Sequence, residues 1–234
     1  NGAHNRNVVE KISNVLKALN ETNLASKDEP LPIYEEGKSM NQLFTVRSLG
    51  IDPATGKEVY LKRNGEKTFV WDAVDKVPMG DSQPKWNGSI SSSFLYKNWS
   101  MNLAFTYSLG AHIYNQTLVD KVENVDIQYN VDKRMLTDRW TTPGVPAKFR
   151  KFDPYAALTR PTSRFVQDVR ELQMTSLNVG YDFRYWGFLK KTGIERLKLQ
   201  FYMNDVFRTS TIKAERGIEY PFARSCSFSL QATF

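Results

Sequence analysis

Cysteine and histidine are nearly absent from this chain of 234 residues, which holds one cysteine and two histidines. A single cysteine, Cys226, excludes an internal disulfide, and it stands among the apolar positions of an alternating segment. Because His4 and His112 lie far apart in the sequence, a zinc site is not expected. We therefore predict neither a metal nor a cofactor.

Long apolar runs are absent as well. No segment approaches the ~18 to 20 apolar residues that a membrane helix needs, which excludes helical spanning only, because a membrane barrel hides its apolar residues in alternation. The chain contains no G-x-S-x-G, Walker, H-E-x-x-H or Rossmann pattern, so we do not expect an enzyme. The net charge is +7, but the basic residues are scattered among 25 acidic ones, which argues against a nucleic-acid partner.

The second half of the chain alternates with the period of a β-strand. From Asn98 to Gly110, large apolar residues occupy every odd position, and small or polar residues occupy every even one. The same alternation predicts five strands, at residues 89–97, 99–113, 171–185, 196–208 and 223–234. These strands are longer than the ~5 to 6 residues usual in globular sheets and suit the ~9 to 11 residues of a membrane barrel.

This alternation has two physical interpretations. In a soluble β-sandwich the apolar face is the dry core, whereas in a membrane barrel it meets lipid and the polar face lines a wet lumen. Alternating connection lengths favour the barrel: the turn Lys97-Asn98 is very short, and the loop 114–170 is very long. Aromatic residues near the turns, Tyr96 and Trp99 in one group and Tyr185, Trp186 and Phe188 in another, are typical of an interfacial girdle.

Residues 1–88 give a weaker pattern, and we treat them as an upstream barrel or loop region of uncertain topology. Apolar residues in 8–22 have helical spacing, although a strand end followed by a loop is also compatible. Residues 43–50 are a candidate strand, and residues 59–70, with Asn64-Gly65 between two apolar segments, are a candidate hairpin. The chain begins with NGAHNRN, so we expect either a processed protein or a piece of a longer one.

Several separate segments resemble one known family. The segments YNQTLVDKVENVDIQYNVDKRMLTDRW (114–140), TRPTSRFVQD (159–168), FYMNDVF (201–207) and KAERGIEYPFARSCSFSLQATF (213–234) resemble the C-terminal part of SusC/RagA-type TonB-dependent outer-membrane transporters. VRSLGIDPATGKEVY (46–60) and GDSQPKWNGS (80–89) resemble the same family further upstream. The resemblance covers most of the chain from about residue 32 onward.

The resemblance implies an all-β fold in which this chain is an antiparallel segment with long extracellular loops, the last strands of a barrel of ~22 strands. Such a barrel needs on the order of 220 strand residues, so we expect the N-terminal plug and earlier strands to lie outside this chain. The implied function is TonB-dependent import of oligosaccharides, or of peptides, across the outer membrane of a Gram-negative bacterium. The implied partners are a SusD-like surface lipoprotein that acts as a lid, TonB, which acts on the plug, and outer-membrane lipid. The alternative is a soluble β-sandwich that binds carbohydrate.

Polar residues near the expected extracellular strand ends are the candidate site residues. His112, Tyr114, Asn204 and Arg208 are candidates for the substrate path, because amides, charged groups and aromatic rings suit sugar binding. The loop residues Arg216, Tyr220 and Arg224 are candidates for bracing neighbouring loops or the lid. Asp120, Glu123 and Asp126 lack the spacing of a calcium loop, and we expect them on a solvated face.

Overall fold

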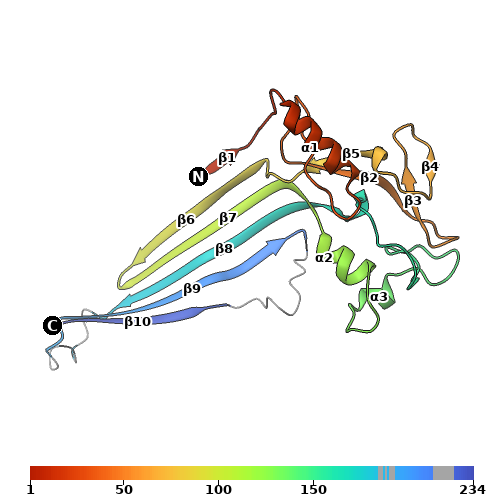
Figure 1. The fold of residues 1–234 in the computed structure, drawn as a ribbon. Helices are drawn as coiled ribbons and strands as arrows, with labels where there is room; N and C mark the ends of the chain where they lie inside the picture. Colours follow the sequence, from red (N-terminus) through yellow and green to blue (C-terminus); the bar gives the residue numbers. More distant parts are fainter. Residues whose placement is uncertain (184–186, 188, 190–192, 213–223) are drawn as a thin grey trace. The chain divides into compact units, whose positions relative to one another are not determined.

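The structure, a computed structural model, describes residues 1–183, 187, 189, 193–212 and 224–234. It divides the chain into two compact units (Figure 1). The first unit contains Asn1–Asn5, Lys85–Gly110 and Val169–Phe234, and the second contains Arg6–Pro84 and Ala111–Asp168. Among the described residues, none of the helices combines the length and the hydrophobicity that crossing a bilayer requires.

The first unit is built on a six-stranded sheet in the order β1-β6-β7-β8-β9-β10. From β6 onward, strands that follow each other in the chain lie side by side (Figure 1). Its strands are β1 (Gly2–His4), β6 (Trp86–Tyr96), β7 (Trp99–Tyr114), β8 (Val166–Asp182), β9 (Arg196–Ser210) and β10 (Cys226–Thr233). The pairings β1–β6, β6–β7, β8–β9 and β9–β10 are antiparallel, as expected for a barrel segment.

The strand bounds differ most from prediction in β8, which begins at Val166 rather than at residue 171. Leu172 and Met174 occupy even positions, whereas Leu177, Val179 and Tyr181 occupy odd ones, so a search for a single period stops between them. The structure places an irregularity of the β8–β9 register there, between Met174 and Ser176, opposite Asp205 with a φ of 50°. There Thr175 of β8 faces two residues of β9, Asp205 and Val206, and the pairing continues across this irregularity. The start of the strand predicted at 223–234 and the end of that at 171–185 fall partly outside the described residues.

The second unit contains a four-stranded sheet in the order β4-β3-β2-β5, together with helix α1. Its strands are β2 (Gln42–Ile51), β3 (Glu58–Leu61), β4 (Lys67–Thr68) and β5 (Lys76–Asp81), with the 3-10 turn η1 (Ala73–Asp75) before β5. The strand expected at 43–50 and the hairpin expected at 59–70 are therefore confirmed. The helix expected over 8–22 is α1 (Asn14–Ala25), which begins later because the Ser13 hydroxyl accepts the amide hydrogen of Leu16 as an N-cap.

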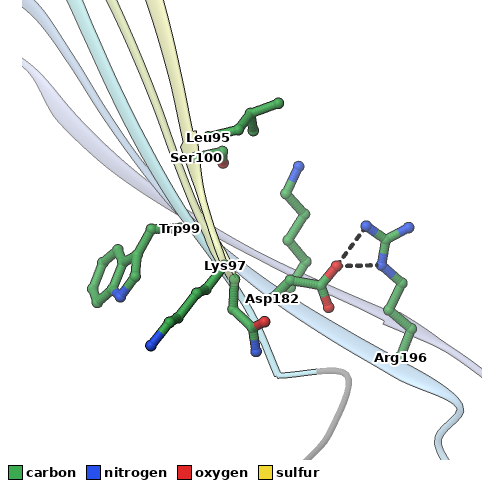
Figure 2. A pocket seen from close by; sticks show the side chains of 8 residues that line it. Leu95, Lys97, Trp99, Ser100, Asp182 and Arg196 are labelled. Atoms are coloured by element: carbon green, nitrogen blue, oxygen red, sulfur yellow. Dashed lines mark hydrogen bonds and ion pairs between the residues drawn. The ribbon is translucent and has the colours of Figure 1, made fainter.

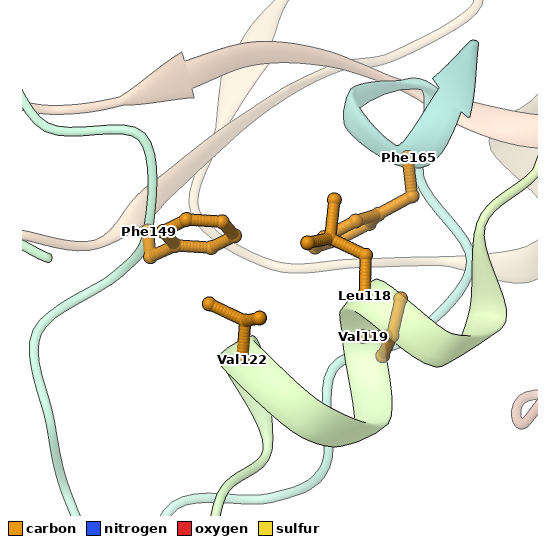
Figure 3. Close-up of a cluster of buried hydrophobic side chains, with 5 residues drawn as sticks. All are labelled: Leu118, Val119, Val122, Phe149 and Phe165. Atoms are coloured by element: carbon orange, nitrogen blue, oxygen red, sulfur yellow. The ribbon is translucent and has the colours of Figure 1, made fainter. Parts of the chain in front are cut away.

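The long connection predicted at 114–170 holds short helical segments rather than a single open loop. These are α2 (Gln116–Leu118), the π-helix η2 (Val119–Glu123), α3 (Arg134–Thr137) and the 3-10 turn η3 (Ser163–Phe165), after which β8 begins. Figure 3 shows the buried cluster that holds this segment together: Leu118, Val119, Val122, Phe149 and Phe165. The segment thus has its own hydrophobic core.

A buried ion network also ties this connection to strand β3. The guanidinium of Arg164 donates to Glu58 at 3.2 and 2.9 Å and to Glu123 at 2.6 Å. The side chains of Glu58 and Glu123 are 3% and 0% exposed, so the expectation that Glu123 lies on a solvated face is wrong. Alternation and helical spacing depend only on nearby residues, so they do not predict an ion pair between Glu123 and a residue 41 positions away.

Candidate functional site

One face of the six-stranded sheet carries nearly all of its large apolar side chains. Residues directly opposite each other in an antiparallel pair share a face, and ring contacts confirm this between Trp99 and Tyr181 at 4.8 Å and between Phe201 and Phe228 at 5.1 Å. The paired strands extend the same face to these residues: Trp86, Ile90, Phe94, Tyr96, Met101, Leu103, Phe105, Tyr107, Leu109, Leu177, Val179, Leu199, Met203 and Leu230.

This apolar face is not the core of the described structure. Phe228 is 72% exposed, Leu230 is 66% exposed and Ile90 is 56% exposed. Leu103 and Phe105 are only half-buried, and Leu199 is exposed, so these side chains do not converge on a dry interior. A soluble sandwich requires such an interior between two sheets. The exposure therefore disfavours the sandwich and agrees with a face that meets a nonaqueous surrounding.

The opposite face is polar and is built mainly from hydroxyl and amide side chains. Its residues are Ser89, Ser91, Ser93, Ser100, Asn102, Thr106, Ser108, Asn178, Gln200, Tyr202, Ser227, Ser229 and Gln231. These groups donate and accept hydrogen bonds without carrying a net charge. In the described residues no group of histidine, cysteine and acidic side chains is placed to hold a metal ion.

A hollow of about 220 Å³ lies on this sheet at the end that carries the short β6–β7 turn (Figure 2). Asp182 accepts from the Nε of Arg196 at 2.8 Å and from its Nη2 at 2.6 Å. Lys198, Leu95 and Ser100 also line the hollow. A Cβ on Gly180 would lie 2.6 Å from the Ser100 hydroxyl, so the glycine keeps this surface open.

Two of the predicted path residues, His112 and Tyr114, belong to the second unit, where β7 ends. The ring of His112 lies against Gly80, whose added Cβ would approach it to 2.4 Å, and its Nδ1 is buried without a hydrogen-bond partner in the described residues. Tyr114 packs edge-on against Phe165 at 6.1 Å and so borders the buried cluster. Both residues therefore make packing contacts, and a role in the substrate path stays a prediction.

The other two, Asn204 and Arg208, belong to the first unit and are both exposed on β9. Arg208 pairs with Glu171 at 2.5 Å, while Asn204 lies opposite Ser176. Of the predicted bracing residues, Arg224 is described and exposed, and Arg216 and Tyr220 lie outside the described residues. None of these placements tests a contact with substrate or lid, so those roles also stay predictions.

Comparison with known proteins agrees with the fold described above. No protein-family model matches the chain. The chain is 28% identical over 154 residues to TonB-dependent receptor P3 of Formosa agariphila, and 26% identical over 157 residues to TonB-dependent receptor P39 of the same organism. Each match covers 65% of this chain but only 14% and 15% of the relatives' lengths.

Among solved structures, the RagAB peptide transporter resembles the chain with a TM-score of 0.62 and 16% identity, covering 76% of this chain and 20% of the other. The open-open state of the RagAB peptide importer gives the same TM-score with 18% identity. The chain is thus similar in sequence to TonB-dependent receptors and similar in fold to the RagAB transporter. Its fold is accordingly that of a segment of an antiparallel β-barrel, as the sequence predicted.

Proposed function

We propose that this chain forms part of the wall of an outer-membrane importer driven through TonB. The exposed apolar face of the six-stranded sheet carries the proposal, because a face of this kind is stable only when something apolar covers it. In the barrel it faces lipid, and the hydroxyl-rich face lines the lumen. The related TonB-dependent receptors support the assignment of the energy source.

We propose oligosaccharides as the cargo. The middle of the polar face carries serine, asparagine and glutamine, which hydrogen-bond to sugar hydroxyls without requiring charge on the solute. Two ion pairs at the ends of the sheet, Asp182 with Arg196 and Glu171 with Arg208, neutralise part of the charge there. Peptides are the second candidate, favoured by the structural similarity to the RagAB peptide transporter.

A surface lipoprotein of the SusD type is the proposed lid, and the loop residues Arg216, Tyr220 and Arg224 are its proposed bracing contacts. The two-component RagAB importers support a partner of this kind.

Growth of a strain that lacks the gene tests this function. We expect the protein in the outer-membrane fraction, and we expect the deletion strain to lose growth on at least one polysaccharide while it grows normally on the corresponding monosaccharide. A strain without TonB should show the same defect. Normal growth on every polysaccharide together with lost uptake of peptides would assign the cargo to peptides, and recovery of the protein in the aqueous fraction would refute the importer altogether.

A further inference from the structure

A single tyrosine interrupts the hydroxyl and amide side chains of the polar face. Between the short β6–β7 turn and the irregular register at Thr175, Tyr202 of β9 is the only aromatic residue on that face of the described sheet. The other aromatic residues paired in this part of the sheet lie on the apolar face. The hydrophobic alternation that builds the sheet therefore does not account for this ring.

The neighbours of Tyr202 on the polar face are short and polar. Asn178 of β8 and Ser227 of β10 lie directly opposite it on the two flanking strands, and side chains in such positions are about 5 Å apart. Gln200 and Asn204 precede and follow it on the same face of β9. The pairings thus place the ring among amide and hydroxyl groups.

The Tyr202 ring is half-buried, yet no other ring and no cationic group of the described residues stacks on it. Its hydroxyl also makes no hydrogen bond to a described residue. On the apolar face, by contrast, rings contact one another, as Phe201 contacts Phe228 at 5.1 Å. Within the described sheet, the ring therefore has no aromatic or cationic partner that a solute would have to displace.

The amide of Asn178 is a second unpaired group beside the ring. Its Oδ1 is buried and has no hydrogen-bond partner among the described residues. Buried acceptors are normally paired, and an unpaired one is unfavourable. A half-turn of the amide exchanges its oxygen and nitrogen, and either atom bonds to a hydroxyl group, since a hydroxyl both donates and accepts. The amide is thus available to a hydroxylated solute.

A pyranose ring matches this combination of groups. Its C–H bonds are slightly positive and are attracted to the negative face of an aromatic ring. Its hydroxyl groups project from the rim of the sugar, where amides and hydroxyls bind them. The row formed by Asn178, Tyr202 and Ser227 contains no charged residue, so it offers no ion pair to the charged groups of a peptide.

We propose that Tyr202 stacks on one pyranose ring of the cargo while Asn178 hydrogen-bonds to its hydroxyl groups, so that this row is a sugar subsite on the lumen wall. The proposal rests on the proposed function, because it names a contact for the oligosaccharide that the importer is proposed to carry. Tyr202 lies four residues, or roughly 13 Å, along β9 from Lys198, which lines the hollow at the short-turn end. The cargo therefore meets this row inside the lumen.

Uptake of a radiolabelled oligosaccharide by cells that carry the whole transporter tests this subsite. The oligosaccharide is prepared from the polysaccharide on which the deletion strain fails to grow. At a concentration below half-saturation, we expect Tyr202→Leu to slow initial uptake about fivefold, as for the loss of one aromatic contact. Tyr202→Phe keeps the ring and should stay within about twofold of the unchanged protein, whereas Asn178→Ala should slow uptake about threefold.

Two controls separate a lost contact from lost protein. Immunoblots of the outer-membrane fraction should show equal amounts of every variant, and Asn178→Ala in particular removes an acceptor that has no partner among the described residues. Leu199→Ala changes the apolar face of the same strand and should leave uptake unchanged.

The outcomes separate this subsite from the proposed function. Unchanged uptake in Tyr202→Leu, or an equal loss in Tyr202→Phe, would refute the stacking contact, and unchanged uptake in Asn178→Ala would refute the hydrogen bond. New sensitivity of the Tyr202→Leu strain to a large antibiotic would show that the ring seats another part of the transporter in the lumen, and would also refute the subsite. Each of these results leaves the importer intact, provided that the unchanged transporter takes up the oligosaccharide. A deletion strain that loses growth on no polysaccharide would refute the sugar cargo first, and the subsite with it.

Discussion

The buried guanidinium of Arg164 offers the sharpest test of how the second unit is held together. Its side chain is 13% exposed and bonds to two carboxylates that are almost fully buried, Glu58 and Glu123. It also donates to the Lys148 carbonyl at 2.7 Å and stacks over Phe165 at 4.4 Å. Arg164→Met keeps much of the apolar volume but leaves both carboxylates without this partner.

The expected cost follows from the geometry. Removing one partner of a buried ion pair typically destabilises by roughly 3–5 kcal/mol, because an uncompensated charge stays in a poorly hydrated site. Arg150, whose Nε lies 3.6 Å from Glu123, offsets part of the loss at that carboxylate but lies too far to replace two short bonds. We therefore expect a loss near 3 kcal/mol, the lower end of that range.

Hydrogen–deuterium exchange of the detergent-purified protein measures this loss at the amides of α2 and η2. A change near 3 kcal/mol corresponds to exchange roughly 100-fold faster or more. Lys62→Met removes an exposed i,i+4 pair with Glu66 and serves as the control, with exchange unchanged. Unchanged exchange in Arg164→Met would refute the network as a stabilising element.

Two further changes test other parts of the second unit. Lys76 is 1% exposed and its ammonium donates to the carbonyls of Leu24 at 2.9 Å and Ser26 at 2.7 Å, so Lys76→Met should destabilise the end of α1 by about 1–3 kcal/mol, measured by exchange of the α1 amides. Burial lowers the pKa of Lys76, so the unfolded chain binds more protons and Lys76 contributes a rise in stability as the pH approaches about 10.4, a contribution that Lys76→Met should remove. Gly56→Ala should destabilise more than Gly65→Ala in thermal unfolding: both glycines have a positive φ, but only at Gly56 would the new Cβ meet a ring, Trp140 at 2.5 Å. Equal losses in the two variants would contradict the Trp140 contact.

The strands of the six-stranded sheet were predictable because the alternation that marks them depends only on residues close together in the chain. In β7 the period of two assigns each residue from Trp99 to Leu109 to one face of the sheet. The short turn Lys97-Asn98 determines the partner strand and its register. The change of period after Met174 shows the limit of that reasoning, since β8 continues past the irregular register at Thr175 while its alternation changes. Alternation alone also left the apolar face open to two interpretations, and the exposure of Phe228 and Leu230 was needed to choose between them.

The second unit was far less predictable, because its stability depends on partners distant in the chain. Arg164 meets Glu58 across 106 positions, and no sequence spacing connects them. The same holds for Lys76. From the sequence it would be expected on the surface, but its ammonium donates to backbone carbonyls at the C-terminal end of α1. His112 was a candidate because of its residue type and its position near a strand end. Neither feature predicts that the His112 ring packs against Gly80.

The claim on which the account depends is that the apolar face of the six-stranded sheet contacts lipid. Nitroxide labels placed singly from Met101 to Ser108, in protein reconstituted into vesicles with Cys226 replaced by serine, measure this face residue by residue. We predict a strict period of two, with odd positions accessible to oxygen dissolved in the bilayer and even positions accessible to a water-soluble nickel chelate. Odd positions shielded from both reagents would show a packed protein core and contradict the account.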